Sequence, residues 1–357
     1  MTRGSVLGVA VLASVLAGAF VLANLSGLDK SDEEPGVPYV RLYDHPEDRL
    51  EVVVNQGDGQ AFAALAQDPL LRRPEIFRAG SPEAAYRAQR PVVGWLALGL
   101  SFGQGELVPL ALVLLSMVGF VALGAAVAWQ LERMGVSPLW AFAVLVTPGA
   151  LVTLDWTGPE CLGTAVALIG FGLWRDGRYR PALIPLVVAA LCRESLLLVP
   201  LALAAHALVI ERRRVRAVLP LGLPFLAYAT WVGVVWLRLD ALPSDAGRGR
   251  LALPFTGILD AVGAWSLADL AFAAILVLAG VLAVVIGNKD PAGWAAGSFL
   301  LASLVFGAEV WARVEDFSRV LLPVVAFAVI VVIPHRMAAR YGPGSSPPTS
   351  AEVRHAG

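Results

Sequence analysis

Charged residues are scarce in this chain. Only 15% of its 357 residues are Asp, Glu, Lys or Arg, whereas 57% are hydrophobic. A soluble domain contains about 25% charged residues, so the composition excludes a soluble globular protein of this length. The formal net charge is −1, so no overall positive field attracts nucleic acid, and no nucleic-acid partner is expected.

Patterns that bind metal ions or form disulfide frameworks are also lacking. The two cysteines, Cys161 and Cys192, lie in separate apolar runs and form no CxxC motif. The four histidines are scattered and form neither an HExxH motif nor any other paired spacing. A disulfide framework, a zinc site and a histidine-based metal cluster are therefore not expected.

Long apolar runs dominate the sequence instead. They cover approximately residues 6–27, 92–131, 137–154, 160–174, 181–210, 215–238, 267–287, 291–309 and 318–334. Because a membrane-spanning helix needs about 20 apolar residues, the pattern predicts an all-α polytopic membrane protein with about ten transmembrane helices. Residues 1–341 are predicted to form a single transmembrane domain. Residues 342–357, which are rich in Gly, Pro and Ser, are predicted to form a disordered cytoplasmic tail.

The first apolar run allows two interpretations. Arg3 precedes a nearly unbroken run from Val6 to about Ala23, which resembles a signal peptide with Ala23 as its cleavage candidate. The apolar core of a signal peptide has about 7–15 residues. This run is longer, which favours a retained first helix.

Basic residues between the apolar runs predict the orientation, because cytoplasmic loops carry an excess of Lys and Arg. These residues are Arg3, Arg133, Arg175, Arg178, Arg180, Arg212, Arg213, Arg214, Arg216, Lys289, Arg336 and Arg340. They place both termini in the cytoplasm, with the protein in the cell membrane, and residues 28–90 in a large first extracytoplasmic loop. In this loop, Ser81-Pro82-Glu83 has the pattern of a helix start, and Gln60 to Leu71 is a candidate surface helix.

The run 181–210 has basic clusters on both sides, so both of its ends are predicted to lie in the cytoplasm. One helix would place these ends on opposite sides of the membrane. The pattern therefore predicts a hairpin of two short spans that turns near Arg193–Glu194. A charge at the membrane centre costs about 2.5–3.5 kcal/mol, so we expect this charged pair at the outer interface.

Ionisable residues gather at the predicted extracytoplasmic ends of the helices, where such groups often mark a functional site. They are Asp58, Asp155, Glu160, Arg193, Glu194, Glu309, Arg313, Glu315, Asp316 and Arg319. Each candidate site residue in this group also has a purely structural interpretation. Asp58 lies in a Gly-Asp-Gly turn pattern, Asp155 and Glu160 suit the start of a helix near Pro159, Arg193 and Glu194 suit a solvated turn, and Arg319 suits snorkelling to the interface.

Several segments together resemble the GT-C superfamily of membrane glycosyltransferases. The similar features are an acidic residue in a large first external loop, the segment before the next helix, a charged hairpin tip, and an arginine at the start of a late helix. They are carried by Asn55-Gln56-Gly57-Asp58-Gly59-Gln60-Ala61-Phe62, Tyr86-Arg87-Ala88-Gln89-Arg90-Pro91, Ala189-Ala190-Leu191-Cys192-Arg193-Glu194-Ser195-Leu196 and Phe317-Ser318-Arg319-Val320-Leu321-Leu322-Pro323.

The resemblance implies an extracytoplasmic transferase. Its donor would be a sugar on a polyprenyl phosphate, and its acceptor a hydroxyl of a lipid, glycan or protein. Asp58 would be the general base, and Arg193 and Arg319 would stabilise the leaving phosphate. Glu194, Asp155 and Glu160 would position sugar hydroxyls or orient an arginine. Many members carry paired acids in the first loop, whereas Asp58 has glycine neighbours, so a divalent metal ion stays open and no cofactor is certain.

Two other classes compete with the enzyme. A multi-pass transporter predicts charges near the membrane centre, broken helices and internal repeats, whereas the charges here lie at helix ends and no repeat is visible. A non-catalytic membrane scaffold is the third interpretation. It stays open because Asp58 lacks the second acidic residue that many family members carry beside it.

Overall fold

The described part of the computed structural model, residues 4–27, 40, 42, 48–55, 58–73 and 76–341, is helical. Apart from helices it contains isolated backbone bridges between Val40 and Phe77 and between Leu251 and Phe306. The predicted all-α class is therefore confirmed. The predicted tail at 342–357 lies outside the described residues.

Within this part of the chain, 4 helices are long and apolar enough to cross a membrane, or up to 6 if each of two bent pairs forms one span. The straight candidates are α1 (Gly4–Gly27), α6 (Val108–Arg133), α13 (Leu223–Leu239) with the preceding turns of α12 (Val215–Val218), and α15 (Leu267–Ile286). The bent pairs are α7 (Phe142–Leu145) with α8 (Pro148–Asp155), at 67°, and α18 (Val314–Val320) with α19 (Leu322–Tyr341), at 58°. Helices of this length and apolarity are those of a membrane protein.

The predicted number of about ten spans is not found, because several apolar runs form helices too short to cross a bilayer. These helices are α9 (Glu160–Arg175), α10 (Tyr179–Cys192), α11 (Leu198–Val209) and α16 (Pro291–Ser303). At a rise of 1.5 Å per residue they extend roughly 18–24 Å, less than the ~30 Å hydrocarbon core. They pack against other helices of the bundle, α9 against both α6 and α10. Part of their apolar surface is thus covered by protein, while side chains such as Ile184 and Leu301 stay exposed.

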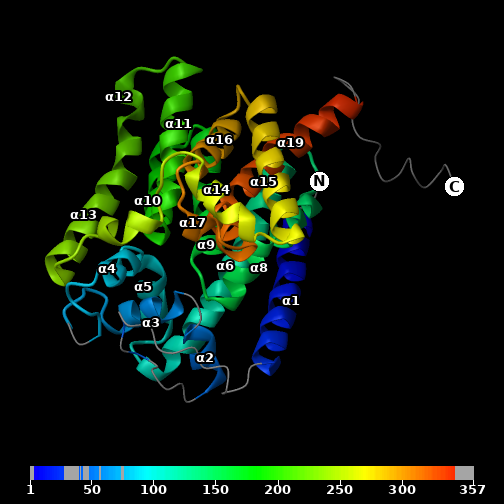
Figure 1. Cartoon of the computed structure of the whole chain (residues 1–357). Coiled ribbons are helices and arrows are strands. Elements are labelled where there is room, and N and C mark those ends of the chain that lie inside the picture. Colours follow the sequence, from blue (N-terminus) through cyan, green and yellow to red (C-terminus); the bar gives the residue numbers. More distant parts are fainter. Residues whose placement is uncertain are drawn as a thin grey trace.

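The turn predicted near Arg193–Glu194 is present between two antiparallel helices, whereas their crossing of the membrane as two short spans stays a prediction. Helix α10 ends at Cys192, and the chain turns through Arg193 and the short helix η4 (Glu194–Leu197) into α11. The guanidinium carbon of Arg213, beyond the end of α11, lies 4.8 Å from the ring centroid of Tyr179 at the start of α10. Both ends of the hairpin therefore meet at one end of the bundle, the upper one in Figure 1.

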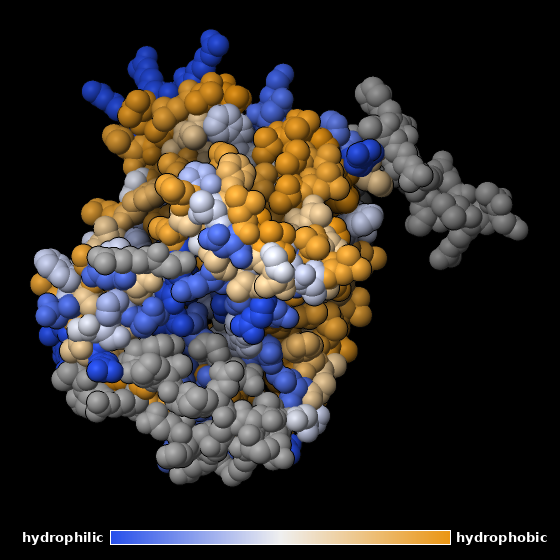
Figure 2. All heavy atoms as spheres, in the orientation of Figure 1, coloured by the Kyte–Doolittle hydropathy of each residue, from blue (hydrophilic) through white to orange (hydrophobic). Residues whose placement is uncertain are grey.

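Other basic loops gather at this same end. Arg133 pairs with Asp176, which joins the ends of α6 and α9. His206 Nε2 lies 3.0 Å from the carbonyl oxygen of Lys289, which joins α11 to the loop after α15. Figure 2 shows an apolar surface below hydrophilic side chains at the top, and hydrophilic residues in a hollow of the lower half.

The first loop is partly folded into the protein. It contains α2 (Arg49–Asn55), α3 (Gly59–Gln67) and α4 (Pro82–Ala88), and α5 (Pro91–Leu100) follows directly after it. The helix start at Ser81 is confirmed, since the Ser81 hydroxyl accepts a hydrogen bond from the Ala84 amide. The expected surface helix is buried instead, because α3 packs against α5. A Cβ atom on Gly94 of α5 would lie only 2.4 Å from Leu65 Cβ, so this contact requires glycine.

Cysteine labelling tests which side of the membrane each end faces. Ser244 is exposed in the segment that follows α13, and Arg216 is exposed in α12, while the native cysteines, Cys161 and Cys192, are buried. In intact cells, Ser244→Cys should react with a membrane-impermeant maleimide and Arg216→Cys should react only after the cells are opened. Labelling in the reverse order would contradict the predicted orientation.

Candidate functional site

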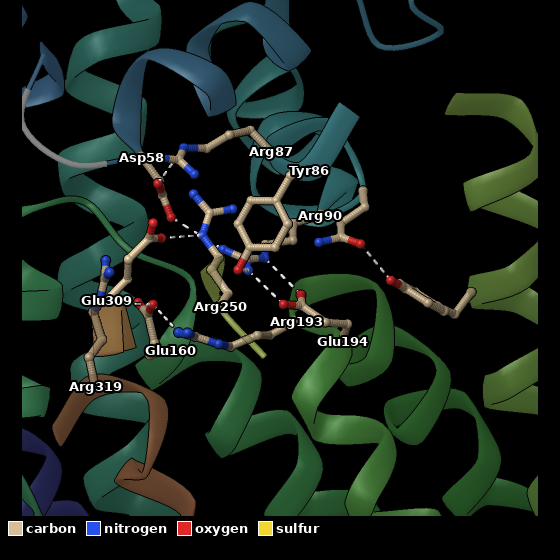
Figure 3. A network of polar contacts seen from close by, with 12 residues as sticks. Asp58, Tyr86, Arg87, Arg90, Glu160, Arg193, Glu194, Arg250, Glu309 and Arg319 are labelled. Atoms are coloured by element: carbon tan, nitrogen blue, oxygen red, sulfur yellow. Dashed lines mark hydrogen bonds and ion pairs between the residues drawn. The ribbon is translucent and has the colours of Figure 1, made fainter. Parts of the chain in front are cut away.

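The hydrophilic hollow contains a cavity of about 200 Å³, here called the polar chamber. Its charged and aromatic lining residues are Asp58, Tyr86, Arg87, Arg90, Arg193, Arg250, Glu309, Asp316 and Arg319. They come from six parts of the chain: the start of α3, α4 and the residues after it, the α10–η4 turn, the segment after η6 (Pro243–Gly249), α17 (Ala308–Trp311) and α18. Figure 3 shows most of these side chains converging on one space.

Asp58 lies at the centre of an ion-pair network. Its Oδ1 is 2.7 Å from Arg87 Nε and its Oδ2 is 3.2 Å from Arg90 Nη1. Burial by itself would raise the pKa of the Asp58 carboxyl, but the charges of Arg87, Arg319, Arg90 and Arg193 outweigh it and hold that pKa well below its ordinary value. A carboxylate in these surroundings stays ionised and is a poor proton acceptor.

Arg90 connects Asp58 to the hairpin tip. Its guanidinium donates two hydrogen bonds to Glu194, from Nε to Oε2 at 2.8 Å and from Nη2 to Oε1 at 2.6 Å. Nη2 also donates to the Tyr86 hydroxyl at 2.7 Å. The Arg90 side chain is only 3% exposed, so its charge depends on these partners. Two-pronged pairing of arginine with a carboxylate fixes the orientation of both groups.

A second ion-pair group joins the hairpin tip to α18. Glu160, at the start of α9, pairs with Arg193 and lies 3.5 Å from Arg319 Nε. The Arg319 guanidinium carbon is also 4.7 Å from the centroid of the Trp156 ring, a cation–π distance. The structure therefore brings together five of the predicted site residues: Asp58, Glu160, Arg193, Glu194 and Arg319.

The sixth, Asp155, neither lines the chamber nor contacts the residues of these two ion-pair groups through an ion pair. Its carboxylate accepts a hydrogen bond from the Asn24 side chain of α1. Asp155 thus ties α8 to α1, a structural contact that sequence spacing did not indicate.

Four further residues of the site, Tyr86, Arg87, Arg90 and Arg250, were not among the site residues predicted from the sequence. The first three lie in the segment before α5 that carries part of the family resemblance, which was the available signal. No local sequence pattern marked Arg250 as a site residue, because the loop that contains it is distant in sequence from the other residues of the site. Its guanidinium lies 3.8 Å from the Tyr86 ring centroid and 2.9 Å from Glu83 Oε2.

Several buried guanidinium atoms around the chamber lack a hydrogen-bond acceptor among the described residues. They are Arg193 Nε, Arg250 Nη1, and Arg319 Nε and Nη1. An unpaired buried donor costs about 1–3 kcal/mol, and more when it is charged. Arg319 Nε still faces Glu160 Oε1 at 3.5 Å, whereas Arg193 Nε, Arg250 Nη1 and Arg319 Nη1 have no acceptor among the described residues. Free donors on three arginines around one small cavity favour the binding of an anion there.

A larger cavity of about 630 Å³, here called the apolar cavity, adjoins the polar chamber. Its lining is mostly apolar and includes Leu198, Leu201, Phe225 and Val232 of α11 and α13. The two cavities share Tyr86, Arg193 and Arg250 in their linings. A ligand that fits both therefore has an anionic head and an apolar body.

The side chains that could act as metal ligands do not suit a divalent metal ion, whose presence the sequence neither predicted nor excluded. Asp58, Glu160 and Glu194 all face arginine guanidinium groups within ion-pair distance. The described residues contain no group of three or more His, Cys, Asp or Glu that could hold a metal ion. Positive charge in the chamber is supplied by arginine side chains.

Close packing between α8 and α18 positions Arg319. A Cβ atom on Gly149 would lie 2.3 Å from the Ser318 carbonyl oxygen and 2.7 Å from the Arg319 amide nitrogen. We expect Gly149→Ala to displace α18 and to destabilise the protein by about 1–3 kcal/mol, measured as a lower thermal unfolding temperature in detergent. Gly8→Ala is the control, since its Cβ would meet no atom within 4 Å. Equal unfolding temperatures for the two variants would contradict this packing.

Comparison with protein families, curated proteins and solved structures finds no match to this chain. The interpretation of the site therefore rests on its own geometry.

Proposed function

We propose that this chain is an integral membrane glycosyltransferase of the GT-C type. It moves a sugar from a polyprenyl-phosphate donor to a hydroxyl acceptor of a lipid, glycan or protein on the extracytoplasmic face. The observation that carries this proposal is the junction of the two cavities, where unpaired guanidinium donors meet an apolar space.

The two cavities suit the two ends of such a donor. The phosphate accepts hydrogen bonds from Arg193, Arg250 and Arg319, whose unpaired nitrogen atoms are buried. The planar guanidinium group matches phosphate oxygens better than an ammonium group does. The polyprenyl chain lies in the apolar cavity, beside α11 and α13.

Leaving-group stabilisation follows from this placement. As the bond between the anomeric carbon and the phosphate oxygen breaks, negative charge develops on the phosphate. Fixed guanidinium groups in a partly buried site stabilise that charge without having to reorganise. Glu160 keeps Arg193 and Arg319 in position, and Glu194 does the same for Arg90.

Asp58 is better suited to orient arginines than to accept a proton. Its carboxylate is buried between Arg87 and Arg90, and its pKa is held below its ordinary value by the surrounding arginine charges against the effect of burial. We therefore propose that Asp58 connects the first loop to the rest of the chamber. This differs from the general-base role that the family resemblance implies.

A transporter for an anionic amphiphile is the second candidate. The bent pairs α7–α8 and α18–α19 favour it, because broken helices at a binding site are common in transporters. Such a protein would use the same two cavities to bind its cargo but would leave the cargo chemically unchanged.

One reconstitution experiment separates these candidates. Purified protein in liposomes is incubated with radiolabelled polyprenyl-phosphate hexoses and pentoses and with an extract of envelope glycans and lipids. A glycosyltransferase releases free polyprenyl phosphate and labels an acceptor. Binding of the donor and its movement between leaflets without bond cleavage would support the transporter, and a lack of donor binding would contradict both.

A further inference from the structure

The carboxylates around the polar chamber differ in how strongly arginines hold them. Asp58 has two guanidinium partners, Glu160 faces Arg193 and Arg319, and Glu194 is held at both oxygens by Arg90. A carboxylate held in this way loses ion pairs when it takes up a proton, so proton uptake is disfavoured. These three are therefore poor general bases.

Asp316 has different surroundings. It lines the polar chamber on α18, and its side chain is 19% exposed. Asp316 forms an ion pair with Arg313, whose Nε lies 3.3 Å from Asp316 Oδ2. Arg313 is 67% exposed, and exposed ion pairs contribute only about 0–1 kcal/mol. Protonation of Asp316 therefore costs little in lost pairing.

The position of Asp316 also suits proton transfer. Asp316 and Arg319 are three residues apart on α18, so they lie on the same face of the helix, and both line the chamber. A hydroxyl bonded to Asp316 would lie beside a phosphate bound to Arg319. Glu309 also lines the chamber, but it is 64% exposed and faces solvent to a much greater extent.

We infer that Asp316 is the general base that activates the acceptor hydroxyl. This inference rests on the proposed transferase function. Asp316 takes the proton of the acceptor hydroxyl while the acceptor oxygen forms a bond to the anomeric carbon of the sugar. The bond from that carbon to the phosphate oxygen breaks, and its electron pair leaves with the polyprenyl phosphate. Asp316 then returns the proton to water.

Other charged groups near Asp316 influence its titration. Arg313, Glu315 and Arg319 lie on α18 itself. The elements packed against α18 contribute Glu309 from α17, Asp269 from α15 and Asp155 from α8. Among the described side chains of α19, the charged and titratable ones, His335 and Arg336, lie near its other end. A pH profile must therefore be compared with that of a variant that changes a neighbouring acid.

The test compares Asp316→Asn with Glu315→Gln, which removes the neighbouring charge of a residue that does not line either cavity. Transfer by Asp316→Asn should fall by about 10²–10⁴-fold, while donor binding stays unchanged. The remaining rate of Asp316→Asn should no longer fall at acidic pH. In a separate test, added formate should partly restore the transfer rate of Asp316→Ala, because it supplies a carboxylate. Glu315→Gln should keep the rate and should retain an acidic limb in its pH profile, shifted towards lower pH because a neighbouring negative charge is removed.

Two outcomes overturn the inference in distinguishable ways. If the wild-type protein transfers sugar and Asp316→Asn keeps the rate and the acidic limb, Asp316 is not the base while the proposed function stands. If the wild-type protein neither binds nor cleaves any polyprenyl-phosphate sugar, the proposed function fails and the assignment of Asp316 fails with it.

Discussion

Replacing Arg319 with alanine is expected to lower the rate of sugar transfer by about 10²–10³-fold. Arg319 has two buried guanidinium nitrogens without a hydrogen-bond acceptor among the described residues, and both belong to a side chain that lines the polar chamber. Removing it takes away fixed positive charge where the leaving phosphate develops negative charge. The measurement is the rate of release of polyprenyl phosphate from a donor that the wild-type protein uses.

Two further variants sharpen this test. Arg319→Lys keeps the charge but loses the planar fork, so it should weaken donor binding and lower the rate less than alanine does. Arg216→Ala removes an exposed arginine near the opposite, basic end of the bundle and should leave the rate unchanged. A wild-type rate for Arg319→Ala would show that Arg319 takes no part in the reaction.

Asp58→Asn is expected to destabilise the fold by about 3–5 kcal/mol, the usual cost of removing one partner from a buried ion pair. Asp58 is only 6% exposed and lies between two arginines, so its loss leaves buried positive charge without compensation. Chemical unfolding in detergent measures the change. Asp245→Asn, at an exposed position, is the control and should be neutral.

A double variant tests whether the ion pair is the cause. The loss of unfolding free energy in the double variant Asp58→Asn/Arg87→Gln should be smaller than the sum of the losses in the two single variants, because both substitutions remove the same contact. If the free-energy losses of the two single variants add up to that of the double variant, Asp58 and Arg87 are not energetically coupled. Stability of Asp58→Asn equal to the wild type would contradict the buried network itself.

The same carboxylate makes stability depend on pH in a defined direction. Its pKa in the folded protein lies below the ordinary value of 3.8. The stabilisation it provides is therefore fully present above about pH 3.8 and is lost as the pH falls through the folded-state pKa. The stabilities of the wild type and Asp58→Asn should differ at neutral pH and converge in strong acid.

The amino-acid sequence by itself determined the class of protein and the general location of its polar residues. Apolar runs and basic loops are local properties of composition, so they could be identified without a fold. The basic clusters around 181–210 predicted the hairpin, and the charged pair between them predicted its tip at Arg193–Glu194. The same reasoning brought Asp58 and Arg319 into one group of ionisable residues.

The tertiary structure alone decided how long each apolar helix is and which ionisable groups meet. An apolar run has the same sequence signature whether lipid or neighbouring helices cover it, so α9, α10, α11 and α16 were counted as spans although they are too short. Ion pairs between Asp58 and Arg90, or between Arg250 and Glu83, join residues 32 and 167 positions apart. No local pattern encodes such contacts, because they exist only when packed helices bring distant side chains into the same small volume.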